Sequence, residues 1–213
     1  MYPFQATTKV MSAILMALVI SGCATSQKMS SEDKQKIKST QISQSVDKGQ
    51  VFLLTPGGSS AGLMFGAAGA LATSGSQANE QTTFLDYLKR NDISIEKIVQ
   101  QEFESALRAS GKLAVVSAPD ASVPTIKLSI PQYGFGVTHL LSSNVVPVLQ
   151  IKGEMIDASS GKVVWSASDR MLPSIASPMD AMEWKQLAGD PKQVEEQLRK
   201  ASKYLSNKLV QSL

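Results

Sequence analysis

The residue with the clearest chemistry in this sequence is Cys23, the only cysteine in a chain of 213 residues. It follows Ile20, Ser21 and Gly22, an aliphatic residue and two small ones, at the end of the apolar run over residues 11–20. Small side chains give a peptidase access to the backbone, and a cysteine thiol is the nucleophile that takes up a diacylglyceryl group. The spacing therefore makes Cys23 the candidate site of covalent modification in this sequence.

The residues before Cys23 have the pattern of a secretory leader. Residues 1–22 contain one charged side chain, Lys9, ahead of an apolar run that is too short to span a bilayer. Residues 20–23 resemble the lipobox of bacterial lipoproteins, which implies palmitate or similar acyl chains on Cys23 and no other cofactor. An ordinary signal peptide with an incidental cysteine, or a short buried helix, fits less well because the one thiol lies where a lipobox requires it.

The residue after the cysteine indicates the destination. Ala24 stands where many lipoproteins retained in the inner membrane have Asp. The resemblance therefore implies that acyl chains anchor the protein to the outer membrane, on its periplasmic face. The predicted organisation is a signal peptide over residues 1–22, the lipidated cysteine and a tether over residues 23–29, and a periplasmic domain over residues 30–213.

The remaining composition argues against several other functions. The chain has 21 basic and 18 acidic residues, a formal charge of +3, and no basic block that would bind nucleic acid. A single histidine and a single cysteine argue against a multi-ligand zinc site, an iron–sulfur cluster and a histidine-based catalytic triad, and no metal-binding or catalytic residue is predicted. His139 has no nucleophile beside it in the sequence and is expected in a loop or interface. A two-carboxylate glycosidase site stays open, because such residues need not be near each other in the chain.

An uncharged segment rich in Gly, Ala and Ser interrupts the predicted domain at residues 57–78. It lies between Lys48 and Glu80, where no charged residue occurs. Two interpretations are open: a loop, or a segment that contacts the membrane or a second copy of the chain. The residues expected to make that contact are Gly62, Leu63, Met64, Phe65 and Gly66.

Two segments have the apolar spacing of amphipathic helices. The first covers residues 93–110, with Asn91 and Asp92 as cap candidates and Gly111 as the C-terminal stop. The second is a long C-terminal helix that starts after Asp190, and its apolar stripe consists of Val194, Leu198, Ala201, Leu205 and Leu209. Shorter helices are expected over residues 30–37 and 177–188.

Alternating or continuous apolar runs predict strands at residues 40–46, 51–55, 113–117, 125–133, 145–157 and 162–170. The segment 113–117 is expected to be buried, and residues 157–161 suit a hairpin with Gly161 at a positive φ. Val163, Trp165 and Ala167 are expected on one buried face. Gly134 and Gly136 are expected in a flexible strand end, because they open no helix and lack the rest of a dinucleotide motif.

This order of elements predicts an α+β fold, a two-layer sandwich with a mixed or mainly antiparallel sheet and two main helices on one face. The helix sequence 95–107, Gly111, the strand 113–116 and the hairpin 156–165 that ends in Trp165 are similar to periplasmic lipoproteins of three families. These are the curli-secretion lipoprotein CsgG, the penicillin-binding-protein activator LpoB and the N-terminal domain of TolB. The resemblance covers about residues 90–170 and implies a module that binds protein partners.

These observations favour a non-enzymatic, outer-membrane-anchored lipoprotein that binds an unidentified envelope protein as an accessory or assembly factor. The first alternative is an oligomeric or pore-associated lipoprotein like CsgG, which would need long lipid-facing strands. The second is an envelope hydrolase or ligand carrier, which would need a pocket with convergent polar groups. A homo-oligomer is compatible with the first two classes.

Overall fold

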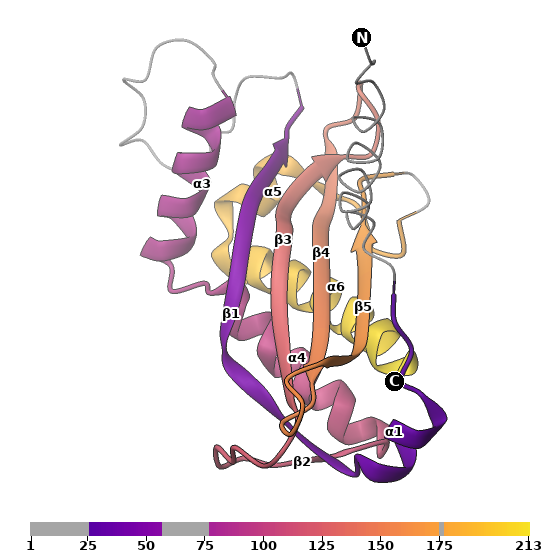
Figure 1. The fold of residues 1–213 in the computed structure, drawn as a ribbon. Helices are drawn as coiled ribbons and strands as arrows, with labels where there is room; N and C mark the ends of the chain where they lie inside the picture. Colours follow the sequence, from indigo (N-terminus) through magenta and orange to yellow (C-terminus); the bar gives the residue numbers. More distant parts are fainter. Residues whose placement is uncertain (1–25, 57–76, 175–176) are drawn as a thin grey trace, which may run out of the picture.

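The computed structural model describes residues 26–56, 77–174 and 177–213, and these form a two-layer α+β fold (Figure 1). The predicted fold class is confirmed. The helices are α1 (Ser31–Lys36), α3 (Gln77–Arg90), α4 (Ile95–Ser110), α5 (Trp184–Gly189) and α6 (Pro191–Gln211). The strands are β1 (Ser39–Leu54), β2 (Ala114–Val115), β3 (Thr125–Val137), β4 (Asn144–Ile156), β5 (Val163–Met171) and β6 (Met182–Glu183).

The sheet is mixed, with the strand order β2-β1-β3-β4-β5 and with β6 paired to β4. β1 runs parallel to both of its neighbours, β2 and β3, whereas β3, β4 and β5 are joined as antiparallel pairs. Parallel strands need a long crossover, and the chain between β1 and β3 supplies it with α3, α4 and β2. α4 and α6 lie behind the sheet in Figure 1, so one face carries the helical layer.

The two main helices start and stop through local capping chemistry. The Ser94 hydroxyl accepts a hydrogen bond from the Lys97 amide at the start of α4, and Gly111 ends it with a φ of 63°. Neither of the expected caps of α4 is used: Asn91 and Asp92 end α3 instead, and Asp92 has a φ of 55°. The Asp190 carboxylate caps α6, with Pro191 as its first residue, as the sequence predicts.

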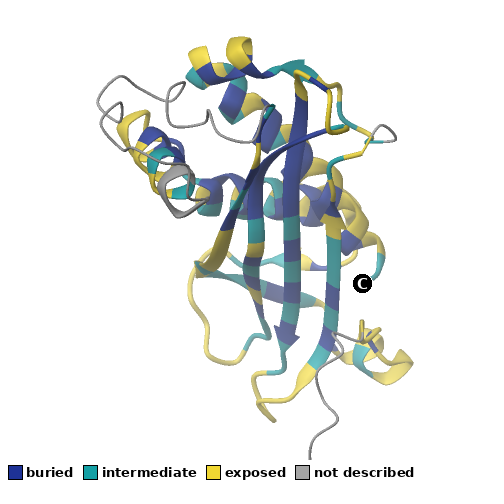
Figure 2. Ribbon diagram, turned by 90° about the horizontal axis from the view of Figure 1, so that it is seen from above, coloured by how far each residue is buried: buried dark blue, intermediate teal, exposed yellow. Residues whose placement is uncertain are grey.

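The core fills the space between the helical layer and the inner face of the sheet. Phe103 on α4 and Leu198 on α6 are fully buried, as are Ile151 and Trp165 on the facing strands. The apolar stripe predicted for the C-terminal helix is buried throughout. Figure 2 shows this as buried positions that alternate with more exposed ones along the strands. Burial of these large side chains supplies the main stabilisation of the fold.

Three local predictions are wrong. The segment 113–117 forms only the two-residue strand β2, with Ala114 exposed, because it pairs at the outer side of β1. Gly134 and Gly136 lie inside β3, which continues to Val137 through regular pairing with β4. The helix expected over residues 177–188 starts later, because Met182 and Glu183 pair with β4 before α5 begins.

An irregularity in the β4–β5 pairing explains a further difference. The register shifts between Met155 and Ile156, so that Trp165 and Ala167 face the core while Val163 remains 36% exposed. Strict alternation would have placed all three on one face, and the bulge removes Val163 from it. The hairpin itself matches the prediction, since Gly161 has a φ of 66°.

Asp157 organises the tight loop of that hairpin. The hydroxyls of Ser160 and Ser159 and the Ser160 amide all donate to its carboxylate. These hydrogen bonds stabilise the charged form and lower the pKa of Asp157 to about 2. The loop therefore keeps its hydrogen bonds across the ordinary pH range.

The chain that enters the domain lies along β5 before α1 begins. The Gln27 amide donates to the Ser166 carbonyl at 2.8 Å, and the Ser166 amide donates to the Gln27 carbonyl at 2.9 Å. The Gln27 side-chain amide also donates to the Val163 carbonyl at 3.0 Å. Met29 is buried in the core. Residues 27–29 of the predicted tether are therefore attached to the folded domain.

Candidate interaction surface

The site residues predicted from the sequence lie outside the described residues. This holds for the lipobox, Ile20, Ser21, Gly22 and Cys23, and for the contact residues Gly62, Leu63, Met64, Phe65 and Gly66. Of the segment 57–78, only residues 77 and 78 are described, as the start of α3. The described part of the chain offers a different candidate, the face of the sheet that points away from the helical layer.

We call this side of β1, β3, β4 and β5 the outer face. No described helix covers it, whereas α4 and α6 cover the opposite side (Figure 1). Its side chains stand in rows across the paired strands, because residues paired across a sheet project to the same side. The composition of these rows changes steadily along the strands, from ionic to amide-bearing to apolar.

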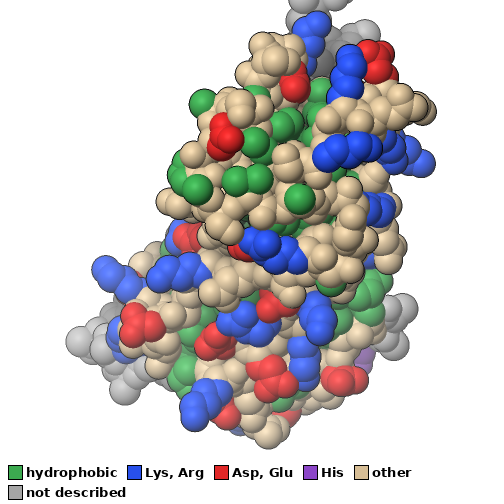
Figure 3. All heavy atoms as spheres, turned by 90° about the horizontal axis from the view of Figure 1, so that it is seen from below, with side chains coloured by type: hydrophobic (Ala, Val, Ile, Leu, Met, Phe, Trp, Pro, Cys, Tyr) green, Lys and Arg blue, Asp and Glu red, His purple; other side chains and the backbone are tan. Residues whose placement is uncertain are grey.

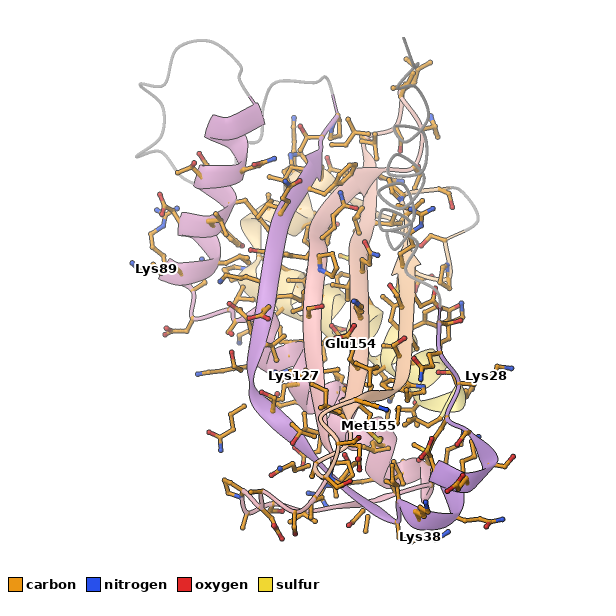
Figure 4. All side chains as sticks on the ribbon, in the orientation of Figure 1. Lys28, Lys38, Lys89, Lys127, Glu154 and Met155 are labelled. Atoms are coloured by element: carbon orange, nitrogen blue, oxygen red, sulfur yellow. The ribbon has the colours of Figure 1, made fainter. Side chains whose placement is uncertain are left out.

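The ionic rows lie near the β4–β5 hairpin. Lys127 on β3 is paired with Glu154 on β4, and Figure 4 shows the two on neighbouring strands. The Lys152 ammonium forms an ion pair with the Glu154 carboxylate at 2.7 Å, and both side chains are about one-third exposed. Charges at this exposure are screened by water, so they give little stability and remain able to interact with a partner.

The middle of the outer face is a row of amides that ends in a cation. Gln50, Gln132, Gln150 and Arg170 stand opposite one another on β1, β3, β4 and β5. The Gln150 side-chain amide donates to the Ser168 hydroxyl at 3.3 Å, while Arg170 is exposed. Such a row presents donors and acceptors across the open side of the sheet, which suits recognition of another polypeptide.

The far end of the outer face is apolar. Val146 and Val148 of β4 lie opposite Gly136 and Gly134 of β3, and both valines are buried. A Cβ atom on Gly136 would lie 2.8 Å from the Pro173 side chain and 3.1 Å from the Phe52 ring. The two rings therefore occupy the space that the glycine leaves, and the outer face ends in a compact apolar cluster.

The loop from β3 to β4 projects beyond this cluster and carries the most exposed large hydrophobic side chains among the described residues. Leu140 is 86% exposed and Leu141 is 94% exposed. His139, beside them, is also exposed in this loop. The periodicity of the sequence does not reveal these leucines, because they belong to no strand or helix. A usable signal exists in the charge pattern, since residues 128–151 contain no Asp, Glu, Lys or Arg.

The hollows on the surface of the described residues include one of about 340 Å³ beside Met179 and Tyr204 and a smaller one near the end of the chain. One hollow of about 250 Å³ is lined by Met29, Lys34, Ile37, Lys112, Leu113 and Leu213. Its two lysines already donate to backbone carbonyls at the end of the chain, Lys34 to Leu213 at 2.7 Å and Lys112 to Gln211 at 2.8 Å. Their charges therefore stabilise the C-terminus rather than converge on an open space.

Within residues 26–56, 77–174 and 177–213, no group of three or more His, Cys, Asp or Glu side chains is placed to hold a metal ion. None of the helices in these ranges is long and apolar enough to cross a membrane.

The helical layer has a mixed charged surface. Glu104 pairs with Arg108, and Arg199 pairs with both Glu195 at 2.8 Å and Glu102 at 3.1 Å. The face drawn in Figure 3 shows acidic and basic side chains interspersed in its lower half and hydrophobic side chains grouped above them. Interspersed charge of this kind is typical of a solvated surface.

Comparison with known proteins gives structural neighbours but no family. No family model matches the sequence, and no curated protein matches it. A PelC dodecamer from Paraburkholderia phytofirmans is 14% identical over 91% of this chain and 92% of its own, with a TM-score of 0.38. The protein XCC0632 from Xanthomonas campestris is 14% identical over 82% of each chain, with a TM-score of 0.38.

A third neighbour is the lipoprotein GNA1162 from Neisseria meningitidis. It is 16% identical over 63% of this chain and 81% of its own, with a TM-score of 0.24. These identities and scores are too low to assign the chain to any of the three proteins. The resemblance of residues 90–170 to the CsgG, LpoB and TolB families stays a prediction.

Proposed function

We propose that the mature chain is an outer-membrane-anchored periplasmic lipoprotein that acts as a non-enzymatic, protein-binding accessory or assembly factor of the cell envelope. The lipobox at residues 20–23 supports the anchor. The uncovered outer face supports the binding role, and it is the observation that carries the proposal: a closed core leaves a sheet whose ionic and amide rows are open to a partner. Shape and mixed polarity of this kind characterise protein interfaces.

The arrangement of polar groups argues for binding rather than chemistry. The outer face holds lysines, glutamines and serines in straight rows, with Lys152 and Glu154 already paired. An active site would bring a nucleophile, a base and an oxyanion donor to one point in a water-excluding pocket. An enzyme or ligand carrier therefore ranks below a binding module.

The alternative of an oligomeric or pore-associated lipoprotein draws on the long hairpin formed by β3 and β4. Each of these strands has 13 residues, a length that suffices to cross a bilayer. Their inner faces, however, pack against the helical layer through residues such as Ile151. A barrel would need those faces elsewhere, so this alternative ranks second.

Substitution Cys23→Ala tests the anchor. The variant is expected to lose lipid incorporation completely and to accumulate as uncleaved precursor, because the sequence has no second thiol to accept the lipid. Labelling of cells with radioactive palmitate, followed by isolation of the protein, measures the first effect, and its electrophoretic mobility measures the second. Undiminished palmitate labelling of the variant would refute lipidation at this residue.

Photocrosslinking tests the binding role of the outer face. A photoreactive amino acid at Gln150, in the middle of the amide row, is expected to capture one discrete envelope protein in living cells. The matched control carries the same amino acid at Glu104 on the solvent side of α4. Equal products from both positions, or products from Glu104 alone, would contradict a partner on the outer face.

A further inference from the structure

We propose that the loop between β3 and β4 inserts into the surface of a lipid bilayer through Leu140 and Leu141, as a second membrane contact of the anchored protein. We call residues 139–143 the β3–β4 tip. The inference deepens the proposed function and rests on its lipid anchor, because the anchor brings the domain to a bilayer. It concerns described residues, and it is independent of the segment 57–78.

The β3–β4 tip is a turn that hydrogen bonds of Ser142 hold together at its base. The Ser142 amide donates to the His139 carbonyl at 2.9 Å, and the Asn144 amide donates to the Ser142 hydroxyl at 2.9 Å. The Thr138 hydroxyl donates to the Ser142 hydroxyl at 3.1 Å. A loop with internally paired polar groups can leave water at lower cost than an open one. These hydrogen bonds fix the turn in the conformation that holds the two leucine side chains outward.

The chain around the tip carries no fixed charge. Residues 128–151 form a continuous stretch of 24 residues without Asp, Glu, Lys or Arg, in which His139 is the only side chain able to become positive. Residues 172–174, which follow β5 at the same end of the sheet, are also uncharged. Insertion here requires no desolvation of an ionic side chain, which is the main cost of placing protein in a membrane.

One acidic side chain lies at the base of the tip but does not project with it. Glu183 on β6 is paired with Asn144 at the base of the tip, and it is half-buried. Its carboxylate accepts a hydrogen bond from the Gln186 amide at 3.0 Å and so caps α5. The charge is therefore held in the fold beside the tip and does not project with the leucines.

Size and tethering favour a bilayer over a protein as the occupant. Two adjacent leucines on a narrow turn offer far less area than the roughly 1,000 Å² that a stable protein interface buries. Cys23 lies only four residues before Gln27, which is hydrogen-bonded to β5, so the lipidated sulfur stays within about 14 Å of the domain. A membrane is thus always within reach, at high effective concentration.

The geometry also fixes an orientation. Gln27 is hydrogen-bonded to Ser166 on β5, and Ser166 is paired with Glu154 on β4. From Glu154, β4 runs ten residues to Asn144 at the base of the tip, so the anchor side and the tip are separated by about 33 Å along this strand. This exceeds the reach of the four-residue tether. Both contacts can touch one bilayer only when β4 lies along the membrane rather than upright on it. The outer face then opens sideways, where a partner in the envelope can approach it.

A fluorescent probe at position 141 tests the insertion. Because lipid occupies the only native thiol, Leu141→Cys gives the lipidated protein one free cysteine for the environment-sensitive dye NBD. The protein is reconstituted into phosphatidylethanolamine and phosphatidylglycerol vesicles with or without nitroxide-labelled acyl chains. We expect a shift of emission to shorter wavelength and strong quenching by the nitroxide. The matched control is Ala158→Cys in the β4–β5 loop, which we expect to show neither effect.

Two further measurements make each outcome decisive. Adding Leu140→Ser to the labelled protein is expected to weaken the quenching, and unchanged quenching would mean that the dye alone drives insertion, which overturns the proposal. A shift to shorter wavelength without nitroxide quenching would place the tip against protein, and the absence of both effects would place it in water; either result overturns it. Mass spectrometry of the Cys23 peptide reports the anchor separately, so a failure of lipidation is distinguished from a failure of the tip.

Discussion

Gly134→Ala is expected to lower the free energy of unfolding by about 3 kcal/mol, a large effect for one methyl group. Gly134 has a φ of 144°, a conformation that side-chain-bearing residues rarely adopt. A Cβ atom there would collide with the Phe52 carbonyl oxygen on the paired strand. That collision is with backbone, so it can be relieved only by moving β1 away from β3. Urea denaturation followed by circular dichroism measures the change.

Gly161→Ala is the matched control for this substitution. Gly161 also has a positive φ, 66°, but nothing lies within 4 Å of the position of its Cβ atom. Its replacement is expected to cost only about 1 kcal/mol, the price of the backbone conformation alone. The difference between the two variants isolates the contact between β1 and β3. Equal losses would show that this contact is not as tight as the structure has it.

Phe103→Ala is expected to destabilise the domain by about 3–5 kcal/mol, and Leu198→Ala by about 2–5 kcal/mol. Both side chains are fully buried, and they come from the two helices that form the layer over the sheet. Truncation removes apolar contacts and leaves a cavity, because the surrounding core can collapse only in part. The midpoint of chemical denaturation of each purified variant, with the slope held constant, gives the change.

Glu104→Ala and Lys200→Ala serve as surface controls on the same helices. Each residue forms an exposed ion pair within its helix, Glu104 with Arg108 and Lys200 with Glu196. Such pairs contribute little, so both variants are expected to stay within roughly 0.5 kcal/mol of the parent. If the surface variants lost more stability than the buried ones, the assignment of the inner helix faces would be wrong.

The helical layer could be predicted from the sequence because its apolar spacing is long and regular. The stripe from Val194 to Leu209 repeats over five positions, and all of them are buried. The β4–β5 hairpin could also be predicted from the sequence, since Gly161 adopts the positive φ that a glycine in such a tight loop favours. Both predictions rest on local sequence patterns, and such predictions hold when the tertiary contacts favour the same local structure.

The misplaced elements depend on contacts that are distant in the sequence. Gly134 reads as a break in the strand, yet it continues β3 because Phe52, 82 residues earlier in the chain, packs beside it on the paired strand. The N-cap of α4 is Ser94, not the predicted Asn91 or Asp92, because α3 extends to Arg90 and those two residues end it. The apolar spacing of residues 77–90 is too weak to indicate this helix in the sequence. Contacts between elements distant in the sequence, and not local sequence preference, set the end of β3 and the start of α4.

The candidate surface was still harder to foresee. The predicted two-layer sandwich implies that one face of the sheet is uncovered, but the rows on that face join residues that are far apart in the sequence, such as Gln50 and Gln132. The exposed pair Leu140 and Leu141 has no periodicity at all. The uncharged stretch 128–151 is visible in the sequence, but its meaning depends on the hairpin that brings its middle to one end of the molecule.

The pairing of Gln27 with Ser166 has a mechanical consequence for the edge of the sheet. β5 is the last strand in the sheet order, and a free strand edge is a template onto which another chain can add. In the described part of the chain, Gln27 occupies that edge through two backbone hydrogen bonds. With the proposed lipid on Cys23, these bonds would lie between the anchor and the core, so tension on the anchor would load them first. A partner that lifts the domain from the bilayer would therefore peel Gln27 away and uncover β5, whereas a slack tether keeps that edge closed.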